Sequence, residues 1–150
     1  MQQTFRIYKA GKEDARRIAE LAILMWEEHT VDELAEEFEA IVESGAVFLA
    51  EDASGKAVAF AQCQLRHDYV EGTETSPVGY LEGIFVREEC RKQGLAKQLL
   101  SACEKWATEQ GCREFASDCE LTNTVSQEFH KRLGFTEANR VVCFVKMLER

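Results

Sequence analysis

One stretch of the sequence joins an apolar run to a helical pattern through a short polar loop that contains glycine. The run covers residues 80–86, the loop covers 91–94, and apolar residues recur with helical spacing over 95–107. A strand that turns into a helix in this way directs several backbone N–H groups and the positive end of the helix dipole to one place. Gly94 and Ala96 present no bulky side chain to an approaching phosphate, and the loop adds two positive charges. The segment therefore predicts a pyrophosphate-binding loop, although a simple turn glycine beside a solvated basic pair would read the same way.

The loop matches neither of the two common nucleotide-binding fingerprints, G-x-x-x-x-G-K-[ST] and G-x-G-x-x-G. It resembles motif A of the GNAT superfamily of acyl-CoA-dependent N-acyltransferases, whose pattern is [RQ]-x-x-G-x-[GA]. Arg91, Gly94 and Ala96 occupy the three defined positions, and Glu88 stands where many members carry proline. The resemblance extends over nearly the whole chain.

This resemblance implies acetyl-CoA as the cosubstrate. Backbone groups of residues 84–86 would hold the pantetheine arm, the amides of residues 91–96 would hold the pyrophosphate, and an N–H near Phe85 would polarise the thioester carbonyl. The expected cofactor-binding residues are Ile84, Phe85, Val86, Arg91, Lys92, Gln93, Gly94, Leu95, Ala96 and Asn123.

The length of 150 residues, with a single proline, predicts one domain that spans residues 1–150. The first residues are polar and no apolar run approaches membrane-spanning length, so we expect a cytoplasmic protein with no membrane partner. The six cysteines form no C-x-x-C pair, and their positions fall within expected strands and helices. Reduced, mostly buried thiols are therefore expected, with neither disulfides nor a metal site.

The formal net charge is −9, and the sequence has no basic stripe. This balance argues against nucleic acid as the main partner. The acidity either serves solubility alone or attracts a cationic substrate, depending on where the carboxylates lie.

Apolar periodicity predicts an α/β (α+β) protein. Strands are expected at 5–9, 46–51, 56–65, 80–86, 113–118 and 140–148, and helices at 12–27, 31–44, 93–110 and 123–133. This order is that of the GNAT fold, which implies a mixed, mostly antiparallel sheet with splayed central parallel strands and helices on both faces.

Two acidic residues are candidates for the chemistry at an amine acceptor. Glu82 lies in the middle of an apolar strand, where a charge has little structural use, and strict alternation would place it on the same face as Tyr80 and Ile84. Asp118 follows the next parallel strand, at the end of the sheet where open α/β folds bind ligands. An acid at a strand end can equally be a turn or cap residue.

The segment that follows offers two further candidates. Asn123 suits a helix N-cap, and in the GNAT pattern an Asn here often also contacts coenzyme A. The run F-H-K-R-L-G-F over 129–135 resembles the family ending F-Y-x-K-x-G-F, in which the tyrosine is credited with protonating the leaving thiolate. His130 occupies that position and either acts as this acid or packs beside the cofactor as a bystander.

Several local stretches are similar to the chromosomal aminoglycoside 6′-N-acetyltransferases. They are R-H-D-Y-V-E-G (66–72), S-P-V-x-Y-L-E-G-I-F-V (76–86), A-K-Q-L (96–99), G-C-R-E-F-A-S-D (111–118) and W-x-x-H (26–29). The similarity implies that Trp26, His29, Tyr69 and Asp118 face a polycationic sugar and that Glu82 addresses the reacting amine. Trp26 could instead simply complete the apolar stripe of its helix.

The sequence thus predicts an enzyme that transfers acetyl from acetyl-CoA to the 6′-amine of an aminoglycoside, which confers resistance by modifying the drug. Direct attack in a ternary complex is expected, because no cysteine has an evident histidine partner for an acyl-enzyme route. The alternatives are a GNAT enzyme for another small amine or polyamine and a non-catalytic acyl-CoA sensor, against which the mid-strand Glu82 argues. The oligomeric state is left open, and a homodimer is compatible with the sequence.

Overall fold

A computed structural model describes residues 4–149 of the chain. These residues fall into two compact units, one that ends at Ser117 and one that begins at Asp118. The prediction of a single domain over 1–150 stays a prediction, and each unit is described by itself below.

The first unit is built on a five-stranded sheet with the order β1-β2-β3-β4-β5. The pairings from β1 to β4 are antiparallel, and β5 runs parallel to β4. The expected mixed, mostly antiparallel sheet is therefore confirmed. The strands are β1 (Arg6–Lys9), β2 (Ala46–Glu51), β3 (Ala57–Arg66), β4 (Val78–Val86) and β5 (Phe115–Ala116).

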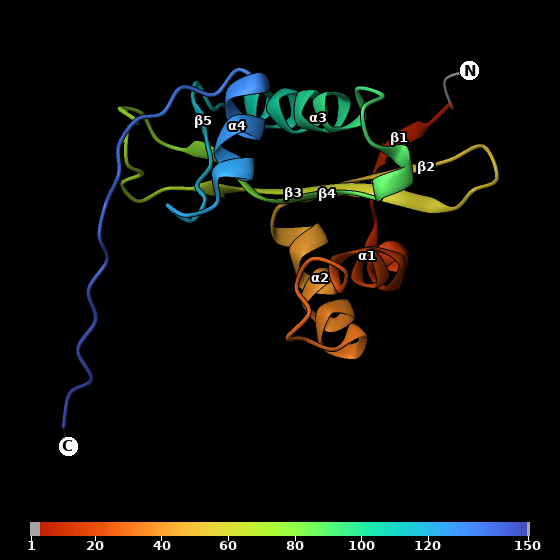
Figure 1. The fold of residues 1–150 in the computed structure, drawn as a ribbon, viewed down its shortest axis with the longest axis horizontal. Helices are drawn as coiled ribbons and strands as arrows, with labels where there is room; N and C mark the ends of the chain where they lie inside the picture. The colour runs from red at the N-terminus through yellow and green to blue at the C-terminus, as the bar shows by residue number, and fades with distance from the viewer. Residues whose placement is uncertain (1–3, 150) are drawn as a thin grey trace. The chain divides into compact units, whose positions relative to one another are not determined.

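Helices cover both faces of this sheet (Figure 1). On one face, α1 (Ala15–Ala22) and α2 (Val31–Ser44) bury a core against β2 and β3 that includes Ile18, Phe38 and Phe60. On the other face lies α3 (Leu95–Glu109), whose buried stripe includes the predicted positions Leu99, Cys103 and Trp106. Two short 3-10 helices, η1 (Lys12–Asp14) and η2 (Glu88–Cys90), precede α1 and α3.

The second helix begins and ends where the sequence predicts. Thr30 is its N-cap, because the Thr30 hydroxyl accepts a hydrogen bond from the Glu33 amide at 3.1 Å. The first helix is shorter than the expected 12–27, since it begins as η1 and ends at Ala22. Turns follow, and they bring Trp26 over β4, where a Cβ added to Gly83 would lie 2.9 Å from the indole ring.

The parallel pair β4–β5 is joined over only two residue pairs, Gly79 with Phe115 and Tyr80 with Ala116. The last strand of this unit is thus shorter than the expected 113–118, because the chain leaves β4 after Ala116. From Leu81 to Val86, no described strand pairs with β4 on its β5 side. The predicted splay of the parallel strands is present.

The second unit holds α4 (Thr124–Arg132) and an extended segment up to residue 149. Gly134 follows the helix with φ +96°, as expected of a C-terminal cap. The expected strand at 140–148 is wrong for the described residues. Its apolar residues are largely exposed and none of them is paired, and an alternating pattern forms a strand only where a neighbour completes the backbone hydrogen bonds.

No helix within residues 4–149 combines the length and the apolar character needed to cross a membrane. The six cysteines are all free, and four of them are buried, as the sequence predicts. Burial raises the pKa of the Cys90 and Cys112 thiols. The pKa of Cys103 is also raised. The main cause is its hydrogen bond with Cys63, and burial adds to the effect.

We expect a thiol-alkylating reagent at neutral pH to modify the exposed Cys119 in the native protein and to leave Cys63 and Cys103 unmodified until the protein is unfolded. The thiolate is the reacting form. Burial keeps the reagent away from both side chains, and the raised pKa of Cys103 also disfavours its thiolate. Mass mapping of the labelled peptides measures this. Labelling of Cys103 at the rate of Cys119 would contradict the packing of α3 on the sheet.

Candidate functional site

The loop between β4 and α3 has an unusual backbone. Lys92 adopts φ 63° and is the one non-glycine residue with positive φ among the described residues, and Gly94 adopts φ 77°. Left-handed residues so close together are typical of loops whose amides surround an anion. Gly94 is the N-cap of α3 and offers no side chain to the free amides of the first turn. The predicted pyrophosphate loop therefore has the required backbone shape.

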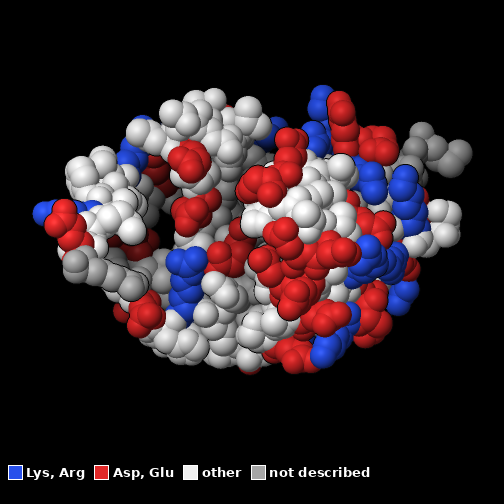
Figure 2. Space-filling view, turned by 90° about the horizontal axis from the view of Figure 1, so that it is seen from below, with Lys and Arg blue, Asp and Glu red and all other residues white. Residues whose placement is uncertain are grey.

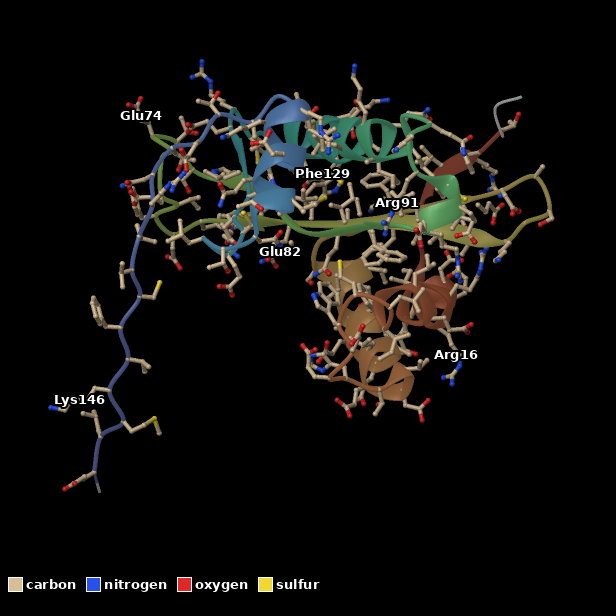
Figure 3. All side chains as sticks on the ribbon, in the orientation of Figure 1. Arg16, Glu74, Glu82, Arg91, Phe129 and Lys146 are labelled. Atoms are coloured by element: carbon tan, nitrogen blue, oxygen red, sulfur yellow. The ribbon has the colours of Figure 1, made fainter. Side chains whose placement is uncertain are left out.

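Side chains anchor this loop on both sides and leave its backbone accessible. Leu95 is 2% exposed, which ties the start of α3 to the core. The Arg91 Nε donates a hydrogen bond to the Val86 carbonyl oxygen at 2.9 Å, and its guanidinium lies 6.0 Å from the centre of the Phe85 ring. Arg91 thus braces the loop against the end of β4 (Figure 3). Lys92 is exposed, whereas Gln93 and Ala96 are half-buried.

The end of β4 offers an unpaired backbone edge next to this loop. Ile84, Phe85 and Val86 pair with β3 on one side, opposite Ala61, Phe60 and Ala59. On the other side no described strand pairs with them. The Val86 carbonyl oxygen accepts from Arg91, and the other backbone groups on that side can receive an extended, amide-bearing ligand as an added strand.

A β-bulge interrupts β4 at Glu82. Leu81 pairs with Cys63 and Gly83 with Gln62, so Glu82 is the extra residue. Beyond the bulge the faces are exchanged, because Gly83 lies against Trp26 and Phe85 packs against the α1–α2 core. The prediction that alternation places Glu82 on the face of Ile84 is therefore wrong, since strict alternation does not survive a bulge.

The Glu82 side chain lies on the α1–α2 side of the sheet, where it meets residues of the neighbouring strand (Figure 3). Arg66 Nη2 donates to Glu82 Oε1 at 3.2 Å and to Oε2 at 3.0 Å. The Gln64 side-chain amide also donates to Oε2. The Arg66 guanidinium lies 3.5 Å above the centre of the Tyr80 ring. These four side chains form what we call the carboxylate cluster, made of Gln64, Arg66, Tyr80 and Glu82.

The three candidates for sugar contacts are arranged differently from one another. Trp26 is half-buried and its ring centroid lies 6.5 Å from that of Phe38, so it packs against the core, but it does so from the turns after α1 and not from a helix stripe. Its indole ring also covers Gly83, the residue next to Glu82. His29 Nδ1 lies 3.7 Å from a Glu33 carboxylate oxygen. Tyr69 is 77% exposed on the loop that follows β3, and its hydroxyl donates to Glu71.

The candidates of the second unit are described within that unit only. Asn123 is the N-cap of α4, because its Oδ1 accepts from the Ser126 amide at 3.0 Å, which confirms the capping role. His130 Nδ1 lies 2.7 Å from the Ser126 carbonyl oxygen, and its ring contacts the Phe135 ring at 5.1 Å between centroids. The Nδ1 proton is therefore directed to Ser126, which fixes the orientation of the ring. Asp118 is exposed at the start of the unit.

Acidic side chains gather on the face of the first unit that α1 and α2 cover (Figure 2). Helix α2 contributes six acidic residues and no basic residue to this face. They are Asp32, Glu33, Glu36, Glu37, Glu39 and Glu43. Helix α2 thus places a strongly negative surface on the side of the sheet to which Glu82 points. Within residues 4–149, no cluster of His, Cys, Asp and Glu could hold a metal ion.

Sequence reasoning missed Gln64 and Arg66. The signal was present, because Gln62, Gln64 and Arg66 follow one another at strand spacing in an otherwise apolar run, and the last two lie at the end of the strand. Such spacing places the last two on one face of β3, and a polar pair on that face needs a partner on the adjacent strand. The partner is Glu82.

The fold is that of N-acetyltransferases. The profile of the acetyltransferase (GNAT) family matches residues 12–135, so the chain belongs to this family. It is 45% identical over 124 residues to an aminoglycoside N(6′)-acetyltransferase type 1 of Salmonella typhimurium strain LT2, covering 81% of this chain and 85% of the relative. It is 42% identical over 144 residues to the Stenotrophomonas maltophilia enzyme of the same name, covering 95% and 94%.

Solved structures of related enzymes have the same architecture. AAC(6′)-Iy in complex with the bisubstrate analogue CoA-S-monomethyl-acetylneamine is 40% identical, with a TM-score of 0.90 over 97% of this chain and 99% of that one. AAC(6′)-Ih from Acinetobacter baumannii is 36% identical, with a TM-score of 0.92 over 97% and 100%. The likeness extends along the full length of these enzymes.

Proposed function

We propose that this protein transfers the acetyl group of acetyl-CoA to the 6′-amine of an aminoglycoside and so confers resistance by modifying the drug. The observation that carries the proposal is that β4 can serve both substrates. Its unpaired edge over residues 84–86 suits the cosubstrate, and two residues earlier Glu82 points to the acidic α1–α2 side. The names of relatives at 45% and 42% identity, and the bisubstrate analogue bound to AAC(6′)-Iy, support this choice of substrates.

The proposed reaction is direct attack in a ternary complex. The neutral amine attacks the thioester carbonyl carbon, the carbonyl oxygen becomes negative, and an N–H near Phe85 stabilises that charge. Collapse breaks the carbon–sulfur bond and releases the thiolate, which takes up one proton. Glu82 binds the ammonium and accepts a proton from the amine, directly or through a water molecule. Asp118 is proposed as a second acid on the amine side, and His130 as the group that protonates the thiolate.

The acetyl-CoA site is proposed from the loop and the free edge of β4. The amides of residues 91–96 would hold the pyrophosphate, Lys92 would add charge, and residues 84–86 would pair with pantetheine. Asn123 is proposed to contact coenzyme A in addition to capping α4.

Trp26, His29 and Tyr69 are proposed to face the sugar, with Trp26 acting from its place in the core. The homodimer and the cytoplasmic location remain predictions.

Replacing Gly94 by valine should weaken acetyl-CoA binding at least about tenfold while the protein stays folded. At φ 77° a β-branched residue is strained, and its side chain would stand where the phosphates approach. Gly94→Asn is the matched control, because asparagine tolerates the left-handed conformation and should lose less. Isothermal titration measures the affinities. Equal acetyl-CoA affinity in wild type and Gly94→Val would refute the loop assignment.

Salt should raise the KM for the aminoglycoside, because screening weakens the attraction between a polycation and the acidic face, while the KM for acetyl-CoA should not follow the same trend. Neutralising Glu36 and Glu39 of α2 to glutamine should reduce this salt dependence. The matched control neutralises Glu104 and Glu109 of α3, on the opposite face of the sheet. If both sets of variants respond alike, the charge of the chain serves solubility only.

Glu82→Gln keeps the shape of the side chain and removes its charge and its capacity to accept a proton. We expect kcat/KM for the aminoglycoside to fall by about 10²-fold or more, with acetyl-CoA affinity nearly unchanged. The loss should shrink at high pH, where more of the amine is already neutral. Steady-state kinetics across pH measures both effects. If Glu82→Gln keeps full activity near neutral pH, Glu82 is not the proton acceptor, and Asp118 becomes the next candidate.

A further inference from the structure

We propose that Arg66 is a positioning residue for the reaction: it holds the Glu82 carboxylate with one oxygen presented to the amine of the substrate. The proposal rests on the function proposed above, since it assumes that Glu82 works on the amine. It adds a residue on the neighbouring strand that touches neither the proposed cofactor edge of β4 nor the motif loop.

The donors of the carboxylate cluster are distributed unequally over the two oxygens of Glu82. Oε2 receives the shorter Arg66 bond, at 3.0 Å, and the Gln64 amide as well. Among residues 4–149, Oε1 receives only the longer Arg66 bond, at 3.2 Å. A carboxylate oxygen has two lone pairs, so Oε1 keeps acceptor capacity that Oε2 has already used. The arrangement therefore selects Oε1 as the oxygen for the substrate.

The Arg66 guanidinium is itself held in place. It lies 3.5 Å above the Tyr80 ring. Because Tyr80 is only 6% exposed, the packing around it holds its ring in place, so Arg66 stacks on a fixed surface. Its Nε is buried and has no hydrogen-bond partner within the described part of the chain. The stacking on Tyr80 and the Nη2 hydrogen bonds to Glu82 thus hold Arg66 in place, although its Nε hydrogen bond is not made within the described residues.

Glu82 needs such support because of its place in β4. As the extra residue of a bulge it has no partner directly opposite on β3, and a glutamate has three side-chain torsions to fix. A misplacement of the order of 1 Å can cost about 10²-fold in rate.

The test is a double-mutant cycle on the turnover of an aminoglycoside by acetyl-CoA. Arg66→Met keeps an apolar stem over Tyr80 and removes the charge and the donors. We expect kcat to fall about tenfold, with the KM for acetyl-CoA unchanged. In the Glu82→Gln background the same replacement should have no further effect, because Arg66 acts through that carboxylate. Arg66→Lys should recover part of the loss, since it restores the charge without the planar stack.

The matched control is Arg6→Met. Arg6 also lies over a tyrosine, 4.5 Å from the centre of the Tyr8 ring, and pairs with Glu51 at 2.8 Å, but on β1 and away from the carboxylate cluster. Its loss should leave kcat unchanged. Thermal unfolding of each variant verifies that the fold is retained. If Arg66→Met does not fold, Arg66→Lys and Gln64→Leu replace it in the double-mutant cycle with Glu82→Gln.

Two results would overturn the inference: full kcat in Arg66→Met, or losses from Arg66→Met and Glu82→Gln that multiply in the double variant. Either result leaves the proposed function intact as long as Glu82→Gln alone is impaired. If Glu82→Gln keeps full activity, the proposed role of Glu82 fails first, and the positioning of its carboxylate fails with it.

Discussion

The site depends on how little of β4 is paired with its parallel neighbour. Two residue pairs, Gly79 with Phe115 and Tyr80 with Ala116, hold β5 to β4, and beyond them one edge of β4 is free of any described strand. Unpaired backbone groups in a sheet must find partners elsewhere, which makes the edge a binding surface for an extended amide chain. The loop with Lys92 and Gly94 in left-handed conformations follows directly after this edge. A single strand end, with the loop that follows it, therefore contains the proposed sites of both pantetheine and pyrophosphate.

The bulge at Glu82 shapes the side of β4 that is proposed to face the amine substrate. It lets one strand direct an acid to the α1–α2 side and, immediately afterwards, place a glycine under Trp26. Arg66 largely neutralises the carboxylate at short range, so the attraction of a polycation must come from the acidic side chains of α2 rather than from Glu82 alone. The roles proposed for Glu82, orientation of the amine and acceptance of its proton, both act at short range.

The sequence predicts the parts of this protein whose signals are local. The helix over 31–44 has a capping threonine and a regular apolar stripe, and the loop at 91–96 has defined residue types at defined spacing. Strict alternation failed at Glu82, because a bulge exchanges the faces and has no mark of its own in the sequence. The expected strand at 140–148 failed because pairing depends on a neighbour that the pattern does not specify. Arg66 was missed because its contact with Glu82 depends on the register of β3 against β4, which the sequence does not specify.

The measurement that tests the proposed function most directly is acetyl transfer to a matched pair of aminoglycosides, one with an amine at the 6′ position and one with a hydroxyl there. With acetyl-CoA, we predict rapid acetylation of the amine, a single acetyl group located at the 6′ nitrogen by mass spectrometry and NMR, and no acetylation of the hydroxyl analogue. Equal rates for the two compounds, acetylation at another position, or turnover only with unrelated amines would contradict the proposed function.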